Sequence, residues 1–146
     1  MADRSSTPDP TRTHTQTGSG PGRLLVAVYA VFAVSASARA GVQLLTRFGE
    51  APVAYLLSAF AALVYVVATV SLARSSPRSR KVAWTAVLTE LAGVLAVGTV
   101  SVADPAAFPD DTVWSGFGRG YAFVPLVLPF LGLLWLRRTG RPAARP

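Results

Sequence analysis

Four long apolar segments constrain this chain more than any other feature of its sequence. They run over residues 24–46, 52–73, 82–103 and 118–136. A hydrocarbon core about 30 Å thick needs about 20 apolar residues in a helix that rises 1.5 Å per residue. None of the segments alternates apolar and polar residues as the strands of a membrane barrel do. The sequence therefore predicts an all-α fold, a bundle of four transmembrane helices within residues 23–138.

Composition agrees with a membrane protein and excludes several kinds of chemistry. Hydrophobic residues make up 51% of the chain and charged residues only 14%, an unusual balance for a soluble domain. There is no cysteine, which excludes disulfides, thiolate metal sites and cysteine nucleophiles. The single histidine, His14, lies outside the apolar segments. We therefore predict no enzymatic activity, with no catalytic residues, cofactor or metal site.

The ends of the chain differ from its centre. Residues 1–22 are rich in Ser, Thr, Pro and Gly and hold almost nothing apolar to bury. That composition predicts a disordered cytoplasmic tail. Residues 139–146 form a second, short basic tail.

Basic residues are distributed unevenly around the apolar segments. On one side stand Arg23, Arg74, Arg78, Arg80, Lys81, Arg137, Arg138, Arg141 and Arg145. The connectors of the other side hold Arg47, Glu50, Asp104, Asp110, Asp111 and Arg119. By the positive-inside rule, both termini are expected to be cytoplasmic in a bacterial cytoplasmic membrane. The formal charge of +7 is thus explained by membrane flanks, and we expect a lipid bilayer, not nucleic acid, as the partner.

Tryptophans support this orientation. Trp84 and Trp135 fall near the cytoplasmic ends of their segments, and Trp114 falls in the long outer connector. Indole rings concentrate at the two membrane–water interfaces. We therefore expect all three tryptophans to lie in interfacial belts.

The first segment also resembles a signal peptide. Small residues Ala38 and Ala40 occupy the −3 and −1 positions of a possible cut before Gly41. Against cleavage, the preceding tail is long and apolar character resumes over residues 41–45. We favour an uncleaved first helix. Cleavage after Ala40 is the alternative, and it leaves three helices in the same orientation.

One acid, Glu90, lies inside the third segment, about 12 Å from its cytoplasmic end. An ionised acid at the centre of a membrane helix costs about 2.5–3.5 kcal/mol, so Glu90 should face protein or water, either paired with a cation or protonated. Tyr65 is nearly level with Glu90, whereas Arg39 lies about 11 Å further out. Thr89 is a neighbouring hydroxyl. Glu90, Tyr65, Arg39 and Thr89 thus form a candidate intramembrane polar site.

Two prolines mark the fourth segment. Pro125 and Pro129 are spaced i, i+4 and should free two carbonyls and kink the helix. The preceding "GFGRG" follows no strand and lacks the G-K-[ST] of a phosphate loop. It predicts a flexible entry into the fourth helix.

Several stretches carry a resemblance to known proteins. They are "RLLVAVYAVFAVSASARAGVQL", "APVAYLLS", "TELAGVLAVGTVSVADP" and, most specifically, "GYAFVPLVLPFLGLLWLRR". Over Arg23 to Arg138 the chain resembles small four-helix integral membrane proteins of Streptomyces and related actinobacteria. That family has no assigned activity, so the resemblance implies location and fold class only.

Two functions fit these features. The chain could be a structural or accessory subunit of a membrane assembly, with Glu90 in a polar contact that holds helices together. Alternatively, it could be a small oligomeric transporter or channel in which Glu90 is a proton or cation site. Glu90 could also pair with Arg39 or with an arginine of a membrane protein partner.

Overall fold

The computed structural model describes residues 20–140 of the chain, so residues 1–19 of the tail predicted over residues 1–22, and residues 141–146, lie outside it. The described residues contain helices and no strand, which confirms the all-α class. The elements are α1 (Gly20–Thr46), α2 (Pro52–Ala73), α3 (Pro77–Ala103), η1 (Pro105–Ala107), η2 (Ser115–Tyr121) and α4 (Val124–Thr139).

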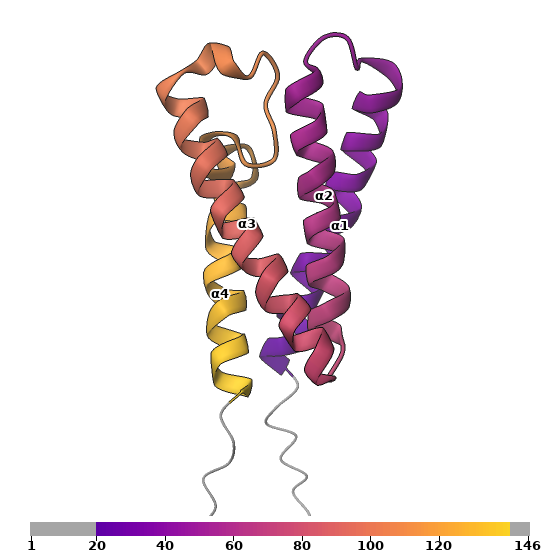
Figure 1. Cartoon of the computed structure of the whole chain (residues 1–146), viewed down its shortest axis with the longest axis vertical. Coiled ribbons are helices and arrows are strands. Elements are labelled where there is room, and N and C mark those ends of the chain that lie inside the picture. The colour runs from indigo at the N-terminus through magenta and orange to yellow at the C-terminus, as the bar shows by residue number, and fades with distance from the viewer. Residues whose placement is uncertain (1–19, 141–146) are drawn as a thin grey trace, which may run out of the picture.

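The long helices lie roughly along one axis (Figure 1). Helices α1, α2 and α3, with 27, 22 and 27 residues, are long and apolar enough to cross a membrane. Helix α4 has 16 residues, about 24 Å at 1.5 Å per residue, which is shorter than the hydrocarbon core. Segment η2 and α4 together make a fourth candidate span, bent by 98°. The described bundle therefore has three helices that could each span a membrane and a bent pair that could form a fourth span.

Small residues let α1 and α2 pack closely. Ala33, Ala36 and Ala40 of α1 are buried, as are Ala54 and Ser58 of α2. In lipid, helix association depends on such close packing because the lipid tails are as apolar as the side chains. Large apolar side chains point outward instead, among them Leu24, Val31, Val34, Leu56, Leu63 and Val102. This outward apolar surface suits a lipid environment.

The ends of the first three helices follow local sequence signals. Helix α2 has the predicted bounds, with Pro52 in its first turn. Helix α3 begins at Pro77, ahead of the predicted residue 82, because Ser76 and Ser79 form a capping box in front of a proline that suits the first turn. Helix α1 begins at Gly20, ahead of the predicted residue 24, so residues 20–22 of the predicted disordered tail are helical. Their flanking residues therefore extend α1 and α3 beyond the apolar segments.

The predicted entry into the fourth helix at residue 118 is wrong. Gly116, Phe117 and Gly118 have φ of 56°, 60° and 81°, and Phe123 has φ of 60°. A left-handed backbone cannot continue a right-handed helix, so α4 begins at Val124.

The prolines of α4 have different roles from the predicted ones. Pro125 stands in the first turn, where a missing N–H costs nothing, so it cannot kink the helix interior. Only Pro129 is inside α4. The 98° bend lies ahead of both prolines, between η2 and α4.

The connector between α3 and α4 folds back into the bundle. It descends beside α3 from the end of that helix (Figure 1). Val113 and Trp114 are 2% and 1% exposed, so the predicted interfacial position of Trp114 is wrong. The hydroxyl of Ser101 on α3 accepts a hydrogen bond from the Gly116 amide at 2.8 Å. The connector is therefore part of the core.

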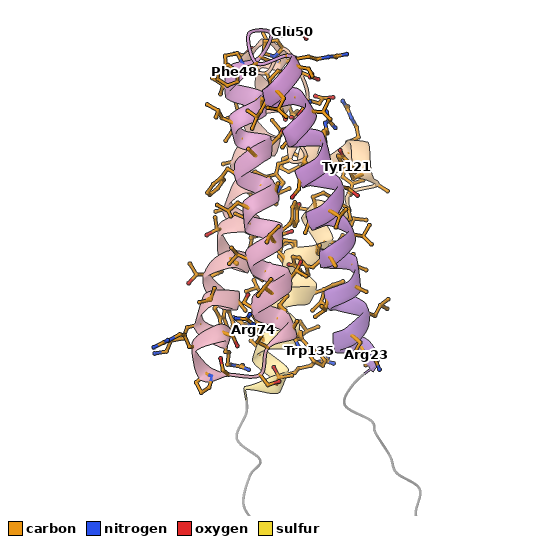
Figure 2. The ribbon with its side chains drawn as sticks, turned by 90° about the vertical axis from the view of Figure 1, so that its right-hand side faces the viewer. Arg23, Phe48, Glu50, Arg74, Tyr121 and Trp135 are labelled. Carbon is orange, nitrogen blue, oxygen red and sulfur yellow. The ribbon has the colours of Figure 1, made fainter. Side chains whose placement is uncertain are left out.

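Charge separates the two ends of the molecule. We call one the basic end, defined by Arg23, Arg74, Arg78, Arg80, Lys81, Arg137 and Arg138. The opposite, loop end contains the α1–α2 connector, with Glu50, and the start of the α3–α4 connector, with Asp104. Figure 2 shows Arg23, Arg74 and Trp135 at the basic end and Phe48 and Glu50 at the loop end.

Candidate functional site

The centre of the site is a hydrogen bond between α1 and α3. The Tyr29 hydroxyl donates to Glu90 Oε2 at 2.7 Å, joining residues 61 positions apart. Both side chains are 0% exposed. The second carboxyl oxygen, Oε1, has no hydrogen-bond partner. Glu90 is thus held by one neutral donor in an enclosed, largely apolar interior.

Tyr65 of α2 belongs to the same cluster but does not bind Glu90. Its ring lies 6.3 Å from that of Tyr29 and 5.6 Å from that of Phe32. Its hydroxyl accepts a hydrogen bond from Trp114 Nε1 at 3.2 Å. Tyr65, the residue expected to lie level with Glu90, therefore belongs to a separate hydrogen bond: Tyr29 donates to Glu90, and Trp114 donates to Tyr65.

Arg39 lies apart from Glu90. Its guanidinium donates to the Tyr121 hydroxyl and to the Asp111 carbonyl, both at 2.8 Å. Arg39 follows Tyr29 by ten positions on α1, about 15 Å along the axis. The alternative in which Arg39 pairs with Glu90 is not formed in this structure, because Arg39 reaches the α3–α4 connector. There it fastens α1 to the segment that carries Trp114.

Thr89 also lies outside the cluster. Its hydroxyl donates to the Thr85 carbonyl of its own helix at 2.8 Å. Adjacent helical residues do not face the same side, so Thr89 cannot follow Glu90 into the interior. Of the four predicted site residues, the structure therefore places Glu90 and Tyr65 in the cluster and excludes Arg39 and Thr89.

Two glycines make room for the aromatic rings. A Cβ atom at Gly132 of α4 would lie 3.1 Å from the Tyr29 hydroxyl and 3.2 Å from Val87 Cγ1. A Cβ atom at Gly93 of α3 would collide with the Trp114 indole ring. Every long helix therefore contributes to the cluster: Tyr29 from α1, Tyr65 from α2, Glu90 from α3 and Gly132 from α4.

Sequence reasoning missed Tyr29 and the burial of Trp114. The sequence does indicate the depth of Tyr29. Counting from Arg23 places Tyr29 about 9 Å from the basic end, and counting from Lys81 places Glu90 about 14 Å from that end. The hydroxyl at the end of a tyrosine ring can cover the difference. No comparable signal exists for Trp114, since a tryptophan in an outer connector normally suits the interface.

The cluster offers hydrogen bonding and, at the Glu90 carboxyl, an acceptor for a proton or a cation. Within residues 20–140, no three His, Cys, Asp or Glu side chains gather where they could hold a metal ion. No protein-family model, curated protein or solved structure matches this chain.

Proposed function

We propose that the chain is an integral protein of a bacterial cytoplasmic membrane that acts as a structural or accessory subunit of a membrane assembly. The enclosure of Glu90 carries this proposal. The one acid inside the three helices that could each span a membrane is 0% exposed and bonded to Tyr29. A transport site must reach water in at least part of its cycle, whereas a structural contact between helices needs no access; the full enclosure of Glu90 therefore favours the structural contact.

The arrangement around Glu90 supports the same role. The interior is lined by three aromatic rings, those of Tyr29 on α1, Tyr65 on α2 and Trp114 in the α3–α4 connector. Arg39 holds that connector against α1. Interhelical hydrogen bonds of this kind stabilise membrane bundles by about 0.6–2 kcal/mol each. The cluster therefore holds the helices together. The outward apolar surface remains available to contact lipid or a membrane partner.

For orientation, we propose that the basic end faces the cytoplasm. Seven basic residues flank the helices there, whereas the connectors of the loop end carry acids as well. With four spans, both termini lie on the cytoplasmic side. The resemblance to actinobacterial four-helix proteins supports the same location.

Native mass spectrometry tests the subunit role. The protein, carrying a C-terminal tag, is purified in mild detergent from the membranes of its own host. A second polypeptide in fixed stoichiometry is the expected result and identifies the assembly. If the protein purifies as a homo-oligomer with no second polypeptide, and vesicles that contain it show proton flux, the subunit role is overturned.

The same spectrum tests signal-peptide cleavage. Removal of the chain up to Ala40 would delete Tyr29, the hydrogen-bond donor to Glu90. We therefore propose that the first helix is retained. A subunit mass corresponding to a start at Gly41 would contradict this.

One observation favours a second candidate, the oligomeric transporter or channel. Glu90 Oε1 is buried without a partner, which leaves an acceptor for a proton or a cation. In this alternative, Glu90→Gln would assemble normally but abolish proton-coupled flux in reconstituted vesicles, with Thr89→Val as a matched control outside the cluster. In the subunit role, both variants assemble and no flux depends on Glu90.

A further inference from the structure

A groove of about 330 Å³ lies between α2 and α3 at the basic end. Its apolar part is lined by Val66, Val67, Val70 and Val82, and its polar part by Ser71, Arg74, Ser76, Arg78 and Ser79. Val66 and Val70 are 39% and 44% exposed. The groove is thus an open surface that changes from apolar to cationic along its length.

The direction of this change matches that of a lipid in a membrane. From Val66 to Arg74, α2 descends by about 12 Å toward the basic end. An acyl chain that follows the valines therefore brings its headgroup to the level of Arg74 and Arg78. Guanidinium groups bind phosphate oxygens with paired, charge-assisted hydrogen bonds.

Arg74 and Arg78 are available for such a ligand. By contrast, Arg39 donates to Tyr121 and Asp111, and Arg80 donates to the Leu136 carbonyl and to Thr139. Within residues 20–140, the Arg74 and Arg78 side chains are exposed and donate to no protein acceptor. The described acids, apart from buried Glu90, lie toward the loop end, so no carboxylate within residues 20–140 neutralises the basic end locally.

We propose that this groove binds one anionic phospholipid, with its phosphate at Arg74 and Arg78 and an acyl chain along Val66 and Val70. Basic clusters next to membrane helices attract anionic headgroups, and basic pockets between helices bind them individually. The site requires only that the chain sits in a membrane, so it is independent of the subunit role.

Native mass spectrometry of the full chain in mild detergent tests the site. The probes are dioleoyl phosphatidylglycerol, dioleoyl phosphatidylcholine and glycerol 3-phosphate, which has the phosphate but no tails. We expect one phosphatidylglycerol to bind. The Arg74→Gln/Arg78→Gln variant should bind it at least about tenfold more weakly.

A matched control separates a defined site from general charge attraction. Arg23→Gln/Arg137→Gln removes the same charge from the same end, but neither residue lines the groove. It should bind phosphatidylglycerol as the parent protein does. Equal losses in both double variants would overturn the site, as would equal binding of phosphatidylcholine or of glycerol 3-phosphate. Val70→Asn tests the acyl contact and should weaken binding with both arginines in place. Unchanged thermal unfolding shows that each variant is folded.

Discussion

The hydroxyl of Tyr29 and the carboxyl of Glu90 meet at 2.7 Å between two helices that the chain separates by 61 residues. Neither side chain touches solvent. Each group therefore depends on the other, since an unpaired hydroxyl or acid in an apolar interior is costly.

This mutual dependence predicts a measurable coupling. Tyr29→Phe and Glu90→Leu should each lower the free energy of unfolding, because each leaves the other polar group unpaired. The double variant should lose less than the sum, with a coupling energy of about 0.6–1.7 kcal/mol. Denaturant unfolding in detergent, followed by circular dichroism, measures it. Glu90→Gln, which keeps an acceptor for Tyr29, should be close to the parent; additive losses would refute the coupling.

Gly93 should tolerate no larger residue while Trp114 is in place. In Gly93→Ala the added methyl collides with the indole ring, and overpacking of this kind costs about 1–3 kcal/mol. The control is Gly41→Ala on α1, where no atom lies within 4 Å of the added Cβ and alanine favours the helix. Thermal unfolding should separate the two variants. In a Trp114→Leu background the penalty at Gly93 should shrink, and an unchanged penalty would argue against this packing.

Arg39 should control the mobility of the α3–α4 connector. Arg39→Gln loses charge-assisted bonds to Tyr121 and Asp111, so amides of residues 108–123 should exchange with deuterium about tenfold faster or more. Arg47→Gln removes the same charge from an exposed position at the loop end and should leave exchange unchanged. Equal exchange in both variants would show that Arg39 does not hold the connector.

Because the chain has no cysteine, single cysteines can report its orientation without background. Ser75→Cys lies in the exposed connector at the basic end and Gly49→Cys in the exposed connector at the loop end. In intact cells, a membrane-impermeant maleimide should label Gly49→Cys and spare Ser75→Cys, while both react after lysis. The reverse pattern would place the basic end outside.

The sequence predicts both bounds of α2, because local signals set them. Pro52 and the polar residues after Ala73 bound α2 as expected, since a proline suits a first turn and arginine ends the apolar run. The fourth segment differs because its limits are tertiary. The "GFGRG" stretch can be helical or left-handed, and contacts of Phe117 with Gly98 and of Gly118 with Pro125 select the latter.

Glu90 was recognisable as a site residue because an acid within an apolar helix is unusual. The partner of Glu90 was not recognisable in the same way, because the tilt of the helices decides which residues lie at the same depth. Helix α3 crosses the bundle obliquely (Figure 1), and counting along straight helices brings both Tyr65 and Tyr29 near the level of Glu90 without choosing between them. The position of Trp114 depends on a connector that folds inward, which residue periodicity does not report.

The inward fold of that connector also bears on the order of synthesis. Every contact that Trp114 makes with Tyr65 and Gly93 is with a residue the ribosome has already delivered. Helices α1 to α3 can therefore assemble first and form the site into which the Trp114 indole ring packs. The last helix then brings Gly132 against Tyr29 and Val87, so the final stage of biogenesis is the docking that closes the interior.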